Sequence, residues 1–282
     1  MMNGYREKLL REAESFISSA PHNVISPETA RTPAMAGLVL FDAPVVGVAA
    51  ADDPLFDELK KPGVMGPHVL GPAEWMSGAK SVISVLLLYS GRVRASNREN
   101  FDWPSIEWTH GRIEGHAMVE NTIRHLIGFI EKLGYRAMSP LLDPRLGPKY
   151  HFDRKADANP PPRFNSRWSE RHAAYIAGLG TFGLSCGLIS HRGMAGRFGS
   201  IISDMELTPD PRPYTGIFDY CIKCGKCVKN CPVGAIGLET GKDHPTCSAF
   251  LDKVLEKEGH PYYGCGKCQV GVPCETGIPK RM

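Results

Sequence analysis

The feature that most constrains this chain is a run of cysteines near its C-terminal end. Residues 221–232 read CIKCGKCVKNCP, which is C-x-x-C-x-x-C-x-x-x-C-P. The first three thiolates of such a run can bind three irons of one cubane, and the fourth then reaches toward a second cluster. Zinc sites more often use two C-x-x-C pairs separated by a longer loop, so the spacing favours a 4Fe–4S cluster over zinc.

The number of cysteines allows two such clusters. Eight of the nine cysteines follow residue 220, and the later ones form an irregular group that includes CGKCQVGVPC. The crossed pattern predicts that one cluster is bound by Cys221, Cys224, Cys227 and Cys274. It predicts that the other is bound by Cys231, Cys247, Cys265 and Cys268. One cluster with spare cysteines is the alternative. The ninth cysteine, Cys186, lies in the apolar run GLSCGLIS and is expected to be a structural thiol.

Composition and the N-terminal segment bear on location. A formal net charge of +3 is too small to indicate nucleic acid or a membrane surface. The segment MMNGYREKLLREAESF carries charges where a secretory signal needs an apolar core. The longest apolar stretch, residues 82–89, is shorter than the about 20 residues that span a bilayer. We therefore expect a cytoplasmic protein without membrane contact, in which crowded cysteines bind metal rather than form disulfides.

The rest of the chain is typical of an α/β domain. Helical patterns cover residues 1–20, 116–134 and 168–177. Short apolar runs typical of strands cover residues 43–50, 81–89, 135–138, 188–190 and 198–203. The segment TPDPRPY at 208–214 is rich in proline and predicts a domain boundary. We therefore expect an α/β domain over residues 1–210 and a cluster-binding module over 211–282.

The size of the first domain indicates a second redox function. A ferredoxin with two clusters needs only a segment about as long as residues 211–282. Two cubanes do not transform an organic substrate unaided, so the first domain is expected to hold another redox centre or to dock one. The sequence has neither G-x-G-x-x-G after a strand nor a Walker A loop, and composition alone does not identify that centre.

Several segments resemble epoxyqueuosine reductase and, more distantly, the reductive dehalogenases. They are VVGVAAADDPLFDELK (45–60), GAKSVISVLLLY (78–89), ERHAAYIAGLGTFGLSCGLIS (170–190) and GRFGSIISDMEL (196–207). The single cysteine between two cysteine groups, with Gly-Cys-x-x-Cys-Gln in the second, also matches those proteins. The order of these motifs along one chain carries the resemblance more than any single motif does.

The resemblance implies a nitroreductase-like α/β (α+β) domain joined to a ferredoxin-like module with two 4Fe–4S clusters. It also implies base-off cobalamin between the two parts and an oxidoreductase that reduces a substrate with two electrons. The segment whose small residues would let a flat corrin approach the backbone is expected to bind it through Ala177, Gly178, Leu179, Gly180 and Gly183. Tight packing of a strand against a helix is the alternative explanation for them.

The resemblance also suggests catalytic residues. A Gly-Arg pair at 111–112 is followed by Glu114 and His116, which match an acidic residue and a histidine of the family with one residue inserted. Both are candidates for proton transfer, or they simply begin a helix. Tyr89 stands where the family has a tyrosine, at the end of the second strand. Arg171 matches the arginine of the E-R pair, where a substrate or corrin contact competes with a surface salt bridge to Glu170 or another acid.

Two departures separate the chain from epoxyqueuosine reductase. Phe164, followed by Asn165, stands where those enzymes have an aspartate seven residues before the arginine. The chain ends eight residues after Cys274, without the C-terminal helical repeats that help to hold tRNA. Both weaken tRNA as the substrate and leave a small molecule or a nucleoside open.

Three hypotheses follow. The first is a cobalamin-dependent reductase that receives electrons from a ferredoxin or flavodoxin. The second is a non-catalytic electron carrier or an activator of a corrinoid partner, and the third is a reductase with flavin in its first domain.

Overall fold

The computed structural model describes residues 2–146 and 166–280. Its centre is a four-stranded antiparallel sheet in the order β1-β2-β6-β3. The strands are β1 (Val45–Ala50), β2 (Ser81–Leu88), β3 (Ala137–Met138) and β6 (Gly196–Ser203). Every residue of β2 is buried, which is expected of a central strand covered on both faces.

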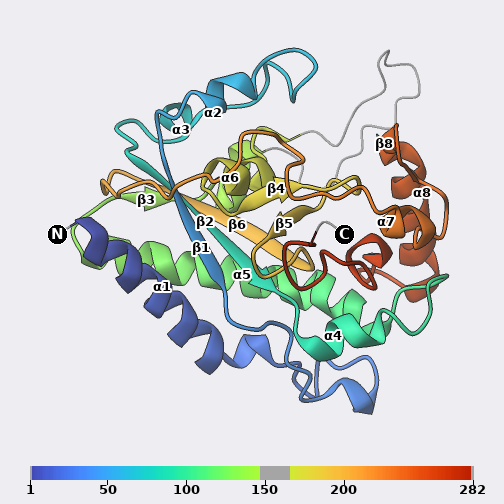
Figure 1. The fold of residues 1–282 in the computed structure, drawn as a ribbon. Helices are drawn as coiled ribbons and strands as arrows, with labels where there is room; N and C mark the ends of the chain where they lie inside the picture. Colours follow the sequence, from blue (N-terminus) through green and yellow to red (C-terminus); the bar gives the residue numbers. More distant parts are fainter. Residues whose placement is uncertain (1, 147–165, 281–282) are drawn as a thin grey trace.

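Helices cover the two faces of this sheet (Figure 1). On one face lie α1 (Met2–Ser19) and the long α5 (Ile106–Lys132). Gly199 of β6 faces Val119 and Ile123 of α5 so closely that a Cβ at Gly199 would lie 2.9–3.1 Å from their side chains. On the other face lie α6 (Glu170–Ile176) and the hairpin of β4 (Gly180–Phe182) and β5 (Leu188–Ser190). The core therefore has two apolar layers, one on each face of the sheet.

Short elements complete the first part of the chain. The α-helices are α2 (Leu55–Glu58), α3 (Pro72–Trp75) and α4 (Gly91–Ser96). The 3-10 turns are Pro21–Asn23, Pro33–Met35, Pro140–Leu142 and Pro144–Leu146. In the described part of the chain, no helix is both long and apolar enough to cross a membrane.

The helix α5 begins ten residues before the predicted residue 116, so the predicted start was wrong. Ser105 caps it, because its hydroxyl accepts a hydrogen bond from the backbone N–H of Trp108 at 3.1 Å. The pattern was missed because residues 106–115 mix buried polar side chains with two glycines. Glu114 and His116 consequently lie inside the helix and do not begin it.

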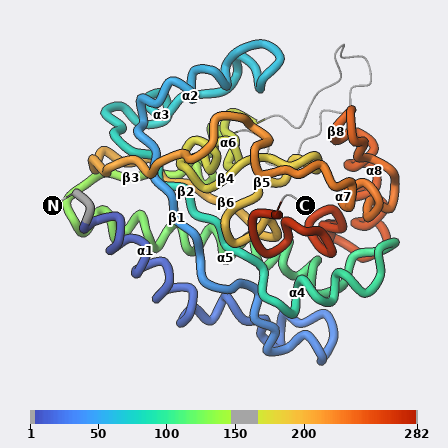
Figure 2. Tube along the Cα trace, in the orientation of Figure 1, coloured from blue at the N-terminus to red at the C-terminus, as the bar shows by residue number. Residues whose placement is uncertain are grey.

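The C-terminal part wraps around one end of the sheet, beside α4 and the first turns of α5 (Figures 1 and 2). It contains α7 (Lys226–Lys229), β7 (Ile236–Gly237), β8 (Gly241–Lys242), α8 (His244–Glu258) and the turn η5 (Lys267–Gln269). The ring of Trp108 occupies the space that a Cβ at Gly266 would need, which brings the two parts into close contact. Arg31 adds an ion pair with Glu258 at 2.7 Å.

The predicted mixed α/β (α+β) class, with a C-terminal ferredoxin-like region, is confirmed. The strand predictions correspond to β1, β2, β3, β5 and β6, whereas β4 and α8 were not predicted. The segment predicted as a boundary packs on the sheet edge, where the Asp210 carboxylate accepts hydrogen bonds from Arg6 and from the backbone N–H of Val48. The division at residue 210 remains a prediction.

Candidate functional site: two cysteine sets and a cationic cavity

Four cysteines of the C-terminal part line one hollow. They are Cys221, Cys224, Cys227 and Cys274, called here the first cysteine set. Ile189, Met194 and Val272 pack beside them, and no charged side chain belongs to the described lining of this hollow. Cys224 is exposed and the other three are partly buried. The run wraps around the hollow because Lys223 and Gly225 adopt positive φ angles of 50° and 72°.

Four other cysteines line a separate cavity and form the second cysteine set. They are Cys231, Cys247, Cys265 and Cys268. Cys231 follows α7, Cys247 lies in the first turn of α8, and the last two flank the start of η5. Folding thus brings thiols that are up to 37 positions apart to one cavity. These two sets coincide with the two predicted groups, although no metal ligation is thereby tested.

Burial strongly disfavours free thiolates in both sets. Burial raises the pKa of Cys274 to about 12 and that of Cys227 to about 11, and the charges of neighbouring cysteines contribute a smaller part of each rise. Burial also raises the pKa of Cys265 to about 12. At neutral pH these thiols are protonated until a metal replaces the proton. Four such thiols around one hollow are the donor set that a 4Fe–4S cluster requires, so these residues fit that group.

Within residues 2–146 and 166–280, no three His, Cys, Asp or Glu side chains gather as ligands of a single metal ion. Each cysteine set instead surrounds a hollow.

Basic side chains complete the cavity of the second set, which we call the cationic cavity. They are Arg112, Arg171, Arg197, Lys242 and Lys267. Lys267 is 1% exposed, and its Nζ donates to the backbone and side-chain oxygens of Asn97 at 2.8 and 2.7 Å. The Asn97 amide in turn donates to the Cys265 carbonyl at 3.0 Å. This contact network holds one wall of the cavity to the end of α4.

Tyr89 lines the same cavity from the end of β2. Its hydroxyl donates to the carbonyl of Gly111 at 2.9 Å, and its ring stacks on Phe41. A Cβ at Gly111 would lie 2.6 Å from the Tyr89 ring, so only glycine at this place in α5 leaves room for it. Tyr89, predicted to be catalytic, is therefore brought to the second cysteine set.

Arg171 also lines the cavity, from the first turn of α6. The residue is exposed, yet desolvation by the surrounding protein lowers the pKa of its guanidinium. The negative charges of Cys186 and Cys268 act in the opposite direction and raise that pKa. Both facts follow if Arg171 faces a hollow inside the protein. Among the described residues no ion pair joins it to Glu170, whose carboxylate oxygens are buried and whose pKa burial raises to about 7. The alternative of a surface salt bridge to Glu170 was wrong.

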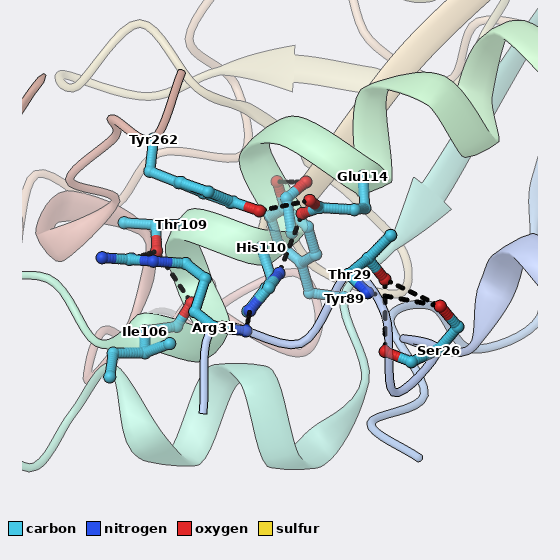
Figure 3. Close-up of polar contacts among 10 residues, drawn as sticks. Ser26, Thr29, Arg31, Tyr89, Ile106, Thr109, His110, Glu114 and Tyr262 are labelled. Atoms are coloured by element: carbon cyan, nitrogen blue, oxygen red, sulfur yellow. Dashed lines mark hydrogen bonds and ion pairs between the residues drawn. The ribbon is translucent and has the colours of Figure 1, made fainter. Parts of the chain in front are cut away.

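Glu114, the first proton-transfer candidate, is tied into a network on α5 (Figure 3). Its Oε1 accepts a hydrogen bond from the hydroxyl of Tyr262 at 2.8 Å. Its Oε2 lies 2.9 Å from Nδ1 of His110, whose Nε2 accepts from the backbone N–H of Arg31 at 3.3 Å. That acceptor role puts the proton of His110 on Nδ1, where it is donated to Glu114. The carboxylate therefore links α5 to the segment that leads to Cys265.

His116, the second proton-transfer candidate, reaches the cavity through a neighbour. Its Nδ1 lies 3.0 Å from Nη2 of Arg197, a cavity residue, and its Nε2 lies 3.6 Å from Glu120. The catalytic roles of Glu114 and His116 remain predictions.

The small residues predicted to bind a corrin pack mainly against the chain itself. A Cβ at Gly178 would lie 2.8 Å from the Pro211 carbonyl, and one at Gly180 only 1.9 Å from the Ile189 carbonyl. Ala177 and Leu179 face Gly47 of β1, while Gly183 lines the hollow of the first set. Their surroundings match the packing alternative. The role of these residues in binding a corrin remains a prediction.

Comparisons with known proteins agree with this arrangement. A family model for the 4Fe–4S binding domain matches residues 214–237. Epoxyqueuosine reductase of Bacillus anthracis is 26% identical over 220 residues, which are 73% of this chain and 51% of that protein. The solved epoxyqueuosine reductase of Bacillus subtilis aligns with a TM-score of 0.55 at 19% identity, covering 99% of this chain and 67% of that one. The chain has the fold of the epoxyqueuosine reductases.

A catabolic reductive dehalogenase gives a TM-score of 0.56 at 14% identity, covering 97% of this chain and 37% of the dehalogenase. The resemblance stated from the sequence is thereby confirmed. The chain spans about half the length of the curated relative from Bacillus anthracis. Phe164, the departure noted at the expected aspartate, lies outside the described residues.

The sequence analysis missed Trp108 and four basic residues of the cavity, namely Arg112, Arg197, Lys242 and Lys267. Of these residues, only Lys267 could have been suspected from the sequence, because it stands between Cys265 and Cys268. The others come from separate elements, and only the three-dimensional packing brings them together.

Proposed function

We propose that this chain is an iron–sulfur oxidoreductase in which two 4Fe–4S clusters deliver electrons to an acceptor beside Tyr89 and Arg171. The observation that carries the proposal is the cationic cavity, because one hollow is lined both by the second cysteine set and by these two residues. A cluster there would lie next to any group bound against Arg171.

The two cysteine sets provide a short path for electrons. Cys224 of the first set is exposed, so an external one-electron donor of the ferredoxin or flavodoxin type can approach it. Cys227 of the first set and Cys268 of the second lie close enough for each charge to act on the other. Electrons would therefore enter at the first set and leave from the second.

The chain's own residues suit the acceptor end of this path. Arg171 presents a guanidinium that no described residue pairs, so it can bind a carboxylate, a phosphate or an amide oxygen of the acceptor. The hydroxyl of Tyr89 donates its hydrogen bond to the Gly111 carbonyl at the cavity wall. There it could instead donate a proton to a reacting atom of the acceptor. The ring of Trp108 packs against Gly266 and lines the cavity beside the second set.

Cobalamin is the acceptor cofactor that the resemblance implies. A structural neighbour was reported with a mechanism for B12-dependent dehalogenation. Held against Arg171 and Tyr89, a corrinoid would supply the two-electron chemistry that one-electron clusters do not perform. A related structure of epoxyqueuosine reductase contains an epoxyqueuosine-modified tRNA stem loop, so a nucleoside-type substrate belongs to the proposal.

Anaerobic purification followed by quantification of iron, cobalt and flavin on one sample tests the proposal. About eight irons and one corrinoid per chain are expected after reconstitution with cobalamin, with the corrinoid retained on gel filtration. The matched variant Arg171→Gln should bind iron normally and retain less corrinoid. A sample with zinc in place of iron would remove the proposal.

Two further outcomes separate the alternatives. Eight irons without any retained corrinoid, but with rapid reduction of a separate corrinoid protein, would identify an electron carrier or activator. Bound flavin in place of corrinoid would identify a flavin-containing reductase.

A further inference from the structure

The environments of the two cysteine sets differ in charge. The described lining of the first hollow has no charged side chain, whereas five basic side chains line the cationic cavity. The lysines of the first cysteine run, Lys223, Lys226 and Lys229, are exposed to water. Water and salt screen an exposed charge, so these three act weakly on a cluster in the first set.

Lys242 is the basic residue most directly placed on the second set. It is partly buried in β8 and lines the cationic cavity together with Cys247 and Cys268. Lys267 and Arg171 add two cations next to Cys265 and Cys268 respectively. The positive charge on this side is thus held close to the ligands, on a buried Lys267, a partly buried Lys242 and an exposed Arg171.

We propose that these cations make the second cluster easier to reduce than the first, with Lys242 as the main positioning charge. The inference rests on the proposed function. Each cluster accepts one electron, [4Fe–4S]²⁺ + e⁻ → [4Fe–4S]¹⁺, and with four thiolates its net charge changes from 2− to 3−. A nearby cation stabilises the 3− state more than the 2− state. The electron, supplied by an external one-electron donor, therefore rests preferentially beside Arg171 and Tyr89.

Solvent exposure acts in the opposite direction and must be weighed. Cys224 is exposed, and water also stabilises the reduced state of the first cluster. Water reaches that cluster from one side only, because Cys221, Cys227 and Cys274 are partly buried against Ile189, Met194 and Val272. Fixed cations line the cavity of the second set itself, and buried or partly buried charges such as Lys267 and Lys242 are screened less than the exposed lysines of the first run. We therefore expect the fixed charges to prevail.

The test is an anaerobic redox titration of the loaded chain with dithionite, followed by EPR. The wild type should show two midpoint potentials. Lys242→Gln should shift the higher one downward by at least a tenfold change in the reduction equilibrium, which is 59 mV for one electron, and leave the lower one unchanged. Lys242→Arg should restore it, because the charge returns. The control Lys226→Gln, at an exposed lysine of the first run, should move neither potential by more than twofold.

The outcomes separate this inference from the proposed function. Iron content is measured on every sample, and about eight irons with two spins per chain establish the two clusters first. With those present, the inference is overturned if Lys242→Gln moves neither potential, moves the lower one, or has no larger effect than Lys226→Gln. If Lys242→Gln loses iron, Arg171→Gln provides the same measurement, since its exposed side chain has no partner among the described residues. A wild-type sample with four irons overturns the two-cluster proposal itself.

Discussion

The two cysteine sets are built from the same residue type but differ in almost every other respect. Three ligand candidates of the first set come from seven consecutive residues, and its hollow is apolar and open at Cys224. The second set collects thiols from three segments of the C-terminal part, and its cavity is also lined by residues of α5, α6 and β6. Local spacing thus specifies the first set, whereas the second depends on the fold of the whole chain.

This difference suggests a division of labour. An open, apolar set suits exchange with an external donor, because a partner can approach it. A cationic set suits delivery to a bound acceptor, because basic side chains line its cavity together with Tyr89 and Arg171. The first part of the chain therefore contributes charged side chains to the lining of the second set only, among the described residues.

The largest expected effect comes from removing one thiol of either set. Cys224→Ala and Cys265→Ala should each lower the iron content from about eight to about four per chain, because each removes a ligand of one cluster. Cys186→Ala is the matched control and should keep all the iron. Iron analysis with EPR after reduction measures this. Loss of all iron in Cys224→Ala, or of four irons in Cys186→Ala, would contradict the assignment of ligands to two separate sets.

The same comparison shows what a sequence can predict. The grouping of Cys221, Cys224 and Cys227 follows from spacing, because the chain between them is too short to separate them. The strands β1 and β2 were predictable because both are short, apolar and β-branched. Tyr89 and Arg171 were found only through the resemblance, since nothing in their local sequence marks them.

Long-range packing explains what was missed. Lys242 is one of many lysines until β8 places it beside Cys247. The glycines Gly178 and Gly180 suggested an open surface for a cofactor, but the structure fills that space with the carbonyls of Pro211 and Ile189. Sequence alone does not distinguish a glycine that admits a ligand from one that admits the backbone of its own chain.

The buried carboxylate of Glu170 on α6, next to Arg171, should make the stability of the chain depend on pH. Burial raises the pKa of Glu170 from 4.5 to about 7, so the folded state binds a proton that the unfolded state has already lost. Stability should then fall as pH rises from about 4.5 to 7 and stay low above that, by about 3 kcal/mol at 1.36 kcal/mol per unit. Glu170→Gln should remove this loss and raise the thermal midpoint at pH 8 more than at pH 6.

The exposed residue Glu131 provides the control for that measurement, because Glu131→Gln should change the midpoint little at either pH. Scans at a fixed rate on iron-loaded samples are compared. An equal gain at pH 6 and pH 8 would show that the carboxylate is not the titrating group.

Two glycines of α5 allow a substitution at the cavity wall to be compared with one elsewhere in the same helix. Gly111→Ala should destabilise the chain by about 1–3 kcal/mol, because its Cβ would lie 2.6 Å from the Tyr89 ring and force it to move. Gly128→Ala in the same helix meets nothing within 4 Å and should stabilise by up to about 1 kcal/mol. Thermal midpoints measure both. If acceptor reduction also falls in Gly111→Ala alone, the position of Tyr89 matters for activity.

The smallest effect is expected at the link between α5 and the second set. Tyr262→Phe removes the 2.8 Å hydrogen bond to Glu114 and should cost about 1 kcal/mol. For a chain of this size that corresponds to a midpoint lower by about 2–4 °C. Tyr175→Phe is the matched control, because its hydroxyl makes only a 3.4 Å contact with the Thr215 carbonyl. If the Tyr262 hydrogen bond stabilises the second set, Tyr262→Phe should also release iron to a chelator faster. Only about half of the iron bound by the chain should be released at the faster rate. Equal release from both sets would mean that the Glu114 network stabilises the C-terminal part as a whole.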